Sequence, residues 1–187
     1  MKGWTGKILR VDLSRGKSTS QEFDSGFALK FFGGRGFAAK LIWDETKPGI
    51  DPLSPENLLV IATGPLTGLS LPSSGKLVVA AKSPLTGGYG DGNMGSWAAV
   101  YLRRAGYDAM VVTGAASEPK YLSVTDTSVE IKDAKDFWTM GCFETERRLK
   151  ERHGRAIGVL TIGQAGENLV RYATVVSQEG RSGGRPG

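Results

Sequence analysis

Apolar and polar residues follow one another along this chain with two periods, one of two residues and one close to 3.6. Alternation with period two, or a short unbroken apolar run, is typical of strands, whereas the longer period is typical of amphipathic helices. Strands are predicted over residues 7–13, 18–23, 58–63, 76–82, 109–113, 120–125, 128–132, 157–162 and 170–176. Helices are predicted over residues 26–32, 36–45, 96–105 and 142–152. Hairpins mixed with helices, without regular alternation of strand and helix, favour an α+β fold.

The predicted elements occur twice in the same order. Residues 56–64 resemble 155–163, and residues 75–82 resemble 170–177. Each pair of strands is preceded by a hairpin and an amphipathic helix and is followed by a glycine-rich segment. This order predicts an internal duplication within a single domain over residues 1–187, with strand-strand-helix-strand-strand halves at about 5–95 and 107–187. The alternative is chance similarity between buried strands.

Two glycine-rich segments lie at equivalent ends of the predicted halves. Residues 83–97 read SPLTGGYGDGNMGSW and lead into the helix that begins near Ser96, while residues 178–187 read QEGRSGGRPG. A glycine loop that opens onto a helix N-terminus presents free backbone N–H groups and the positive end of the helix dipole. We therefore expect these segments to bind a phosphate or another anionic group, one end of the ligand in each half.

Composition limits the class of protein. The chain of 187 residues is 40% hydrophobic and 23% charged, which suits one globular domain, and 27 glycines are about twice the usual share. The single cysteine, Cys142, excludes an intramolecular disulfide and an iron–sulfur cluster held by this chain alone. The sequence shows no transmembrane window and no signal peptide, so a cytoplasmic location is expected.

The chain has a net charge of +5, but its basic residues are dispersed. The longest basic clusters are pairs, and no nucleic-acid-binding motif is present, so neither nucleic acid nor a membrane is the expected partner. Four cations stand in or beside glycine-rich stretches: Arg35, Lys76, Arg181 and Arg185. At such positions a cation reaches a ligand that the backbone also approaches.

Several short motifs together resemble a known family. They are PLSPEN at 52–57, GPLTG at 64–68, KSPLTG at 82–87, AGYDA at 105–109, GQAGEN at 163–168 and RSGGR at 181–185. In this order they resemble the N-terminal domain of the tungsten-containing aldehyde:ferredoxin oxidoreductases, over essentially the whole chain. The resemblance implies an oxidoreductase fold of two similar α+β halves, on which a tungsten or molybdenum bis-pterin cofactor sits. It implies oxidation of aldehydes to carboxylic acids, with ferredoxin as the electron acceptor.

The resemblance also assigns ligand contacts. It implies cofactor binding by Lys76, Asn93, Gly95, Arg181, Ser182, Gly184 and Arg185. A magnesium ion between the two pterin phosphates is implied at the backbone of Asn93 and Ser182. Three positions depart from the family pattern: Lys76 replaces arginine, Ser182 replaces alanine and Pro186 replaces glycine. Lysine keeps the charge but loses the bidentate fork, and proline removes an N–H donor.

The resemblance places the rest of the machinery elsewhere. The family's [4Fe-4S] cluster ligands and substrate pocket lie in downstream domains, so no catalytic residue is expected in this chain. The chain alone is expected to be inactive. The alternative hypothesis is a non-catalytic binding or scaffold module that reuses the fold. The sequence makes no prediction of the oligomeric state.

Other signals have simpler readings. Residues 34–39 match the dinucleotide fingerprint G-x-G-x-x-A, but a helix precedes them where that motif needs a strand, so a helix–helix corner is favoured. Asp91, an acid in an anion-binding segment, is interpreted as a turn residue and not as a magnesium ligand. Trp4, Trp43 and Trp138 are expected in the core, and Trp97 is expected either in the core or stacked on a pterin.

Overall fold

The computed structural model describes residues 2–178 and 180–184. Its strands are β1 (Lys7–Asp12), β2 (Lys17–Glu22), β3 (Leu59–Thr63), β4 (Lys76–Lys82), β5 (Tyr89–Gly95), β6 (Ala109–Thr113), β7 (Lys120–Val124), β8 (Val129–Asp133), β9 (Thr174–Ser177) and β10 (Arg181–Gly184). Its α-helices are α1 (Ser25–Phe31), α2 (Arg35–Glu45), α3 (Trp97–Arg104), α4 (Cys142–His153) and α5 (Gly163–Glu167), with a 3₁₀ turn η1 at Lys135–Phe137.

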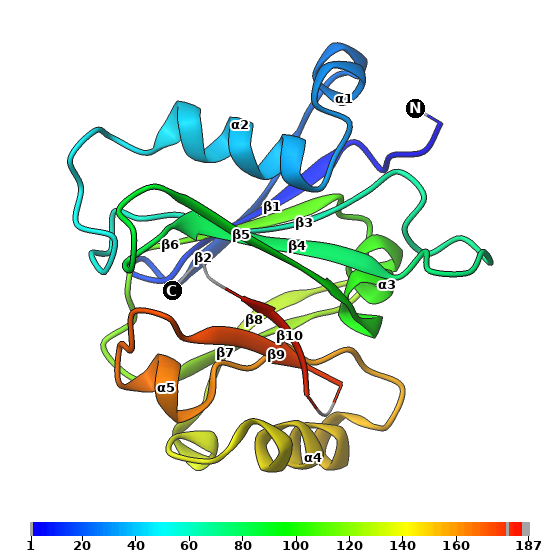
Figure 1. The fold of residues 1–187 in the computed structure, drawn as a ribbon. Helices are drawn as coiled ribbons and strands as arrows, with labels where there is room; N and C mark the ends of the chain where they lie inside the picture. Colours follow the sequence, from blue (N-terminus) through cyan, green and yellow to red (C-terminus); the bar gives the residue numbers. More distant parts are fainter. Residues whose placement is uncertain (1, 179, 185–187) are drawn as a thin grey trace.

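The largest unit is a six-stranded sheet with the order β2-β1-β6-β3-β4-β5. Its strands pair antiparallel, except that β1 and β6 are parallel. Helices α1 and α2 cover one face of this sheet, and the small sheets β7-β8 and β9-β10 lie on the other side (Figure 1). Helix α4 closes the far side of the small sheets (Figure 1). The result is an α+β fold in helix–sheet–sheet–helix layers.

Two apolar layers flank the large sheet, because alternate residues of a strand point to opposite faces. One layer joins Phe37, Ala38, Leu41 and Ile42 of α2 to residues of β3 and β4 such as Val78. The other layer lies between the large sheet and β9. It is formed by Ile61, Leu77, Val79, Met94, Ala99, Leu102 and Val175. The opposite orientation of Val78 and Val79 in β4 therefore fixes which face of the sheet each layer covers.

The corner between α1 and α2 depends on glycine. Gly36 has no room for a side chain, since a Cβ there would overlap the carbonyl oxygen of Phe31. Gly33 adopts a φ of 113°, and a Cβ on it would lie 2.7 Å from the carbonyl oxygen of Thr63. Both glycines allow the corner to sit against the end of β3, where Gly34 N donates to Thr63 O over 2.9 Å. The helix–helix corner predicted at 34–39 is confirmed.

The main difference from the sequence prediction is in the glycine-rich segment 83–97. Residues 89–95 form strand β5, not a loop, and pair with β4 over its whole length. Glycine and asparagine are poor strand formers, but a complete antiparallel partner with a buried face outweighs that preference. The chain therefore presents its glycines on an edge strand.

Two strands predicted in the second half are shorter or absent. Residues 157–162 form only a single bridge, between Thr161 and Val176, and the strand predicted at 170–176 begins at Thr174. Gly158 packs so closely on the first turn of α3 that a Cβ would overlap the backbone of Ala98. This segment therefore contacts a helix where a strand partner was expected.

The tryptophan predictions were wrong for two residues. The side chain of Trp43 on α2 is 85% exposed, and Trp138 is 41% exposed. On α2 the buried side is formed by Phe37, Ala38, Leu41 and Ile42, and residue 43 falls outside that stripe. Trp97 is also exposed, which contradicts its core interpretation.

Candidate functional site

Three of the predicted residues come together where β4, β5 and β10 meet. Lys76 begins β4 and pairs with Gly95, the last residue of β5. A Cβ built on Gly95 would lie 3.2 Å from Arg181 Nη1 and 3.8 Å from Lys76 Nζ, so both cations converge over this glycine. Within residues 2–178 and 180–184, neither cation has an ion-pair partner. Two unpaired cations over bare backbone form a site for an anion.

Strand β10 is held beside β5 by hydrogen bonds at the end of β9. Ser96 Oγ, next to Gly95, lies 2.8 Å from Ser177 Oγ, and Ser177 Oγ donates to Val159 O over 2.6 Å. Both serine side chains are buried. Gly183 of β10 packs on Met94, where a Cβ would lie 3.1 Å from Met94 Cε. These contacts bring β5 and β10 of the two glycine-rich segments, which are far apart in sequence, side by side (Figure 1).

The N-terminus of α3 does not provide the anion site that the sequence predicted. Ala98 N donates to the capping Ser96 Oγ over 2.9 Å, and Ala99 N donates to Ser96 O over 3.2 Å. Trp97 N donates to Gln178 Oε1 over 3.0 Å. Because these N–H groups already have acceptors inside the protein, they are not available to a ligand. The positive character of the site comes from Lys76 and Arg181 instead.

Asn93 lies two residues from Gly95 on the same face of β5, where its register partner is Val78. Its amide oxygen accepts from Arg35 Nη1 at 2.8 Å and from Arg35 Nη2 at 3.0 Å when it is turned toward the guanidinium. Arg35 Nε also donates to Asp91 Oδ2. The interpretation of Asp91 as a turn residue was wrong, because Asp91 is a strand residue in an ion pair with Arg35.

The other predicted ligand residues lie along β10. Ser182 is exposed and alternates to the face opposite Arg181 and Gly183, and Gly184 ends the strand opposite Thr174. Arg185 and Pro186 lie outside the described residues. The structure therefore brings Lys76, Gly95 and Arg181 together, with Asn93 beside them on β5 and Ser182 and Gly184 beside them on β10.

Tyr89, at the start of β5, reports on the electrostatics of this face. Burial, together with the nearby Asp91 carboxylate, raises the pKa of Tyr89 to about 12, while the Arg35 guanidinium acts in the opposite direction. The phenol therefore stays protonated at neutral pH and offers an O–H group beside the ion pair.

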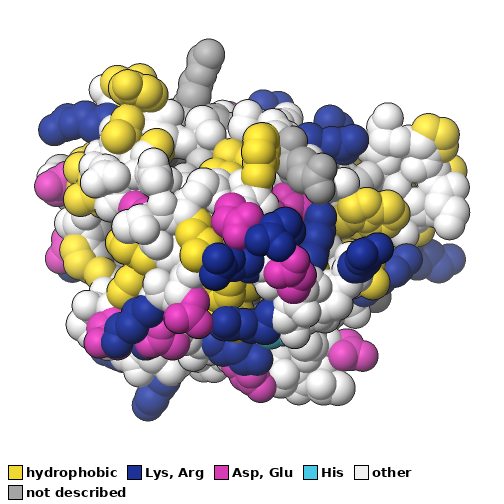
Figure 2. Space-filling view, turned by 90° about the horizontal axis from the view of Figure 1, so that it is seen from below, with side chains coloured by type: hydrophobic (Ala, Val, Ile, Leu, Met, Phe, Trp, Pro, Cys, Tyr) yellow, Lys and Arg dark blue, Asp and Glu magenta, His cyan; other side chains and the backbone are white. Residues whose placement is uncertain are grey.

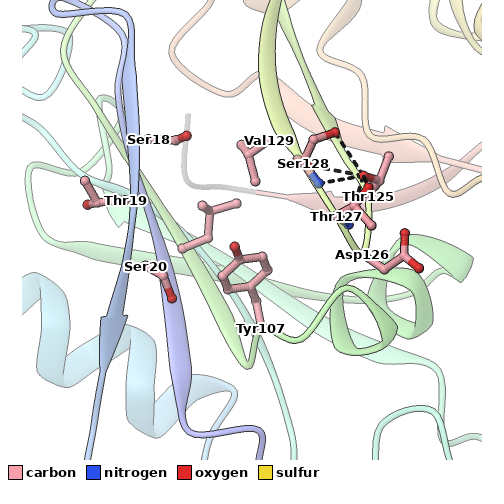
Figure 3. Close-up of a pocket in the computed structure, with 10 residues that line it drawn as sticks. Ser18, Thr19, Ser20, Tyr107, Thr125, Asp126, Thr127, Ser128 and Val129 are labelled. Carbon is pink, nitrogen blue, oxygen red and sulfur yellow. Dashed lines mark hydrogen bonds between the residues drawn. The ribbon is translucent and has the colours of Figure 1, made fainter.

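A separate cavity of about 240 Å³ lies between β2 and the β7–β8 hairpin. Residues 18–20 of β2 and residues 125–129 of the hairpin line it together with Tyr107 (Figure 3). Most of these side chains are hydroxyls, and Thr125 bonds within the hairpin turn to Ser128 (Figure 3). The predicted ligand residues that the structure describes do not line this cavity.

The face of α4 has many charges, but they are paired. Viewed from that side, basic and acidic side chains are interspersed (Figure 2). The ion pairs are Arg147–Glu144, Arg147–Glu151, Arg148–Glu144, Lys150–Glu146 and Arg152–Asp136. Mutual neutralisation makes this face a weaker anion site than the β4–β5–β10 edge.

The described residues form neither a metal-binding cluster nor a membrane-spanning helix. Between residues 2 and 184, leaving out 179, no group of three His, Cys, Asp or Glu side chains is placed to hold a metal ion. In the same part of the chain, the helices are too short or too polar to cross a membrane.

Comparison with known proteins identifies the family. Residues 8–187 match the model of the aldehyde ferredoxin oxidoreductase N-terminal domain. The chain belongs to the aldehyde ferredoxin oxidoreductase family. The resemblance seen in the sequence motifs is thereby confirmed, and the chain is the N-terminal domain of an oxidoreductase family.

Individual relatives extend over the whole domain. The chain is 46% identical over 188 residues to the tungsten-containing aldehyde ferredoxin oxidoreductase of Pyrococcus horikoshii. This match covers 100% of the chain and 31% of that relative. It is 36% identical to an aliphatic sulfonate oxidoreductase, WOR-like subunit, of Pyrococcus furiosus, over 95% of the chain and 31% of the relative. The chain therefore spans about a third of the length of these family members.

A solved structure has the same fold. It is the active site complex BamBC of benzoyl coenzyme A reductase in complex with 1,5-dienoyl-CoA, with a TM-score of 0.95 and 35% identity. The similarity covers 100% of this chain and 28% of that chain. The α+β architecture of this family domain is thus shared with the benzoyl coenzyme A reductase complex.

Sequence reasoning missed the residues that support the site. The sequence predicts Arg35 as a cation near a ligand and Gln178 as part of a glycine-rich segment, but not their contacts with Asp91 and Trp97, and it assigns no role to Ser177. The available signal was the pairing of opposite charges: Asp91 is an acid in a glycine-rich segment, and Arg35 is a base in another. Ser177 and Gln178 give no comparable signal, because their partners lie 81 residues away.

Proposed function

We propose that this domain binds the phosphate-bearing ends of a tungsten or molybdenum bis-pterin cofactor in a larger aldehyde-oxidising enzyme. The observation that carries the proposal is the convergence of Lys76 Nζ and Arg181 Nη1 over Gly95. Phosphate groups carry charge close to −2 near neutral pH, and two cations without an ion-pair partner among residues 2–178 and 180–184 match that charge. The names of several relatives support tungsten as the metal.

The residues of the site suit such a group. Gly95 leaves open the volume that a Cβ would fill, and β5 is the edge strand, so one side of its backbone has no strand partner in the large sheet. Lys76, Arg181, the Asn93 side chain and Gly184 would hold the two phosphate ends, with Arg185 continuing the same segment. When bound, the metal–pterin group supplies the redox chemistry, and this chain supplies charge and position.

Further components follow from family membership. We propose that backbone carbonyls of Asn93 and Ser182 bind a magnesium ion between the phosphates, since Mg²⁺ prefers oxygen ligands. The [4Fe-4S] cluster and the substrate pocket would lie in the remainder of the protein. Electrons from the aldehyde would pass through that cluster to ferredoxin in the cytoplasm.

Relatives with different substrates support a role in holding the cofactor. The names include oxidoreductases for aldehydes and aliphatic sulfonates, and the similar solved structure is a benzoyl coenzyme A reductase. A domain shared by enzymes with such different substrates is suited to a component that they have in common. A common metal–pterin group is such a component, whereas a substrate pocket is not.

We also propose that the internal duplication predicted from sequence is present, since glycine-rich strands β5 and β10 contribute to one site. In such a duplication, hairpin β1-β2, helix α2 and strands β3-β4-β5 would correspond to hairpin β7-β8, helix α4 and the series Thr161–β9–β10. Strand β6 belongs to the second half in sequence but pairs with β1 and β3 of the first half. Superposition of residues 59–95 on 161–184 tests the proposal: strand-for-strand overlap is expected, and an unrelated path would contradict it.

The proposed function is tested by analysis of the full-length enzyme. We expect tungsten or molybdenum by metal analysis and an organic pterin released by acid oxidation, with about two pterins for each metal. Protein that contains neither metal nor pterin, after expression with both metals supplied, would contradict the proposal.

A further inference from the structure

Asp91 places a carboxylate in the middle of the surface that is proposed to bind an anion. Its side chain is 18% exposed and is engaged by Arg35, the first residue of α2. We propose that Arg35, anchored by Asp91, is a positioning residue that turns the Asn93 amide so that its Nδ2 group faces the ligand. This inference rests on the proposed function, because it specifies how one residue of that site meets a phosphate oxygen.

The guanidinium sets the orientation of the amide. Arg35 Nη1 and Nη2 carry only donors, and they lie 2.8 Å and 3.0 Å from the amide atom of Asn93 that faces them. Only the amide oxygen accepts from these donors, since the NH₂ group would oppose donor to donor. Arg35 therefore fixes Oδ1 toward itself, and the two N–H bonds of Nδ2 are left to point elsewhere.

Asp91 fixes the guanidinium in turn. Arg35 Nε donates to Asp91 Oδ2, so the planar group is held on both edges, by Asp91 and by Asn93. Asp91, Asn93 and Gly95 alternate with buried Met94 along β5, and therefore share one face of the strand. The ion pair also offsets the negative charge of Asp91 next to an anion.

Every polar side chain that this arrangement turns toward a ligand is then a donor. Lys76 Nζ and Arg181 Nη1 lie over Gly95, and Asn93, exposed on the same strand, contributes Nδ2. An amide oxygen in that place would oppose the oxygens of a phosphate. Lysine at position 35 keeps the positive charge but has a single ammonium group in place of the planar guanidinium. It therefore cannot bind Asp91 and Asn93 at the same time.

The test is a double-mutant cycle on the loaded full-length enzyme. The readout is the rate at which pterin is released into buffer of fixed ionic strength, together with pterin retained per protein. Arg35→Lys is expected to speed release about tenfold, and Asn93→Ala by a similar factor, which is the scale of one hydrogen bond to a charged acceptor. In the Asn93→Ala background, Arg35→Lys should change the rate by less than about twofold.

Lys40→Gln is the matched control. Lys40 lies on the same helix but outside the site, and its Nζ is 2.7 Å from Asp44 Oδ1. It should release pterin at the wild-type rate. A wild-type rate for Arg35→Lys overturns the positioning role, and so do factors that multiply in the double variant, since Arg35 then acts without Asn93. A wild-type enzyme that contains no pterin contradicts the proposed function itself, which is a different result.

Discussion

At the scale of single residues, the site depends on the absence of a side chain at Gly95. Its backbone lies under the ends of two long cationic side chains, and any side chain there competes with them for space. The glycine is therefore required by a close approach, because its place in β5 does not require a positive φ. Lys76 and Arg181, which have no ion-pair partner in the described part of the chain, can bind an anion there because that volume is open.

Gly95→Val is expected to lower cofactor content without unfolding the protein. The new Cβ would lie 3.2 Å from Arg181 Nη1 and would displace the guanidinium, while valine suits a strand. The free energy of unfolding should change by no more than about 0.5 kcal/mol, which is the range of most surface substitutions. The measurement is pterin per protein beside thermal unfolding. Gly88→Val is the control, because only Thr86 Oγ1 lies within 4 Å of its Cβ position.

Tyr89 gives a spectroscopic test of the charges on β5. Because its pKa is raised to about 12, its phenol should not ionise at pH 10, where a free tyrosine is half ionised. Between about pH 10 and 12 the unfolded chain loses a proton that the folded chain keeps, so folding is weakened as pH rises. Ultraviolet titration of wild type against Tyr89→Phe isolates this residue, and Asp91→Asn should lower its pKa. A midpoint near 10 would contradict the account.

At the scale of elements, regular hydrophobic periods were predicted well and glycine-rich segments were not. Strands β1, β3, β4 and β6 and helices α2, α3 and α4 lie where alternation or helical spacing placed them. Strand β5 has no such pattern, since it reads YGDGNMG, and it forms because β4 supplies a complete partner. The segment at 157–162 had an apolar strand pattern, but its glycine allows it to pack on α3.

The acid-sensitive element is α4. Hydrogen bonds from Arg147 and Arg148 to Glu144 lower the pKa of this carboxylate from its ordinary 4.5 to about 2. Its stabilisation is present above about pH 4.5 and is lost as pH falls toward 2, because the unfolded chain then binds a proton that the folded chain does not. The charges are exposed, so added salt should weaken the effect.

Glu144→Gln should flatten this acid limb. The measurement is the midpoint of thermal unfolding of wild type and variant, taken at several values between about pH 5 and pH 2 at low salt. The two proteins should differ most at the upper end of this range and converge at the lower end. A constant difference across the range would show that Glu144 does not stabilise the fold through its charge.

At the scale of the whole molecule, one buried carboxylate ties the N-terminus to the centre of the chain. Asp108 is 1% exposed, accepts from Thr5 N, Thr5 Oγ1 and Gly6 N, and forms an ion pair with Arg103 of α3. Arg103 Nη2 also donates to Gly3 O over 3.0 Å. The segment before β1 is thus attached to the connection between α3 and β6, about 100 residues away in sequence.

Asp108→Asn is expected to destabilise the domain by about 3–5 kcal/mol, because it leaves the buried Arg103 cation without its counter-charge. Urea unfolding of the 187-residue chain measures the change. Asp126→Asn, on the exposed β7–β8 turn, should leave the midpoint unchanged. A loss of unfolding free energy below about 1 kcal/mol would contradict this expectation. It would show that the backbone contacts, and not the charge of Asp108, stabilise this part of the fold.

The sequence allowed the α+β class and the meeting of Lys76, Gly95 and Arg181 to be predicted, the latter through family motifs. It did not allow the supporting contacts to be predicted, since Ser96–Ser177 and Arg35–Asn93 join residues brought together only by the packing of layers. The anion site expected at the helix N-terminus could not be judged from sequence for the same reason. Trp97 N donates to Gln178 Oε1, and Gln178 lies 81 residues further along the chain.

The central claim is that Arg181 binds the anionic end of the cofactor. Its most direct test is tungsten and pterin content of the full-length enzyme carrying Arg181→Glu, beside Arg155→Glu, which reverses an exposed arginine before the Thr161 bridge. We expect Arg181→Glu to lower affinity tenfold or more, roughly the value of a charged hydrogen bond replaced by repulsion, and Arg155→Glu to match wild type. Equal cofactor content in all three proteins would contradict the account.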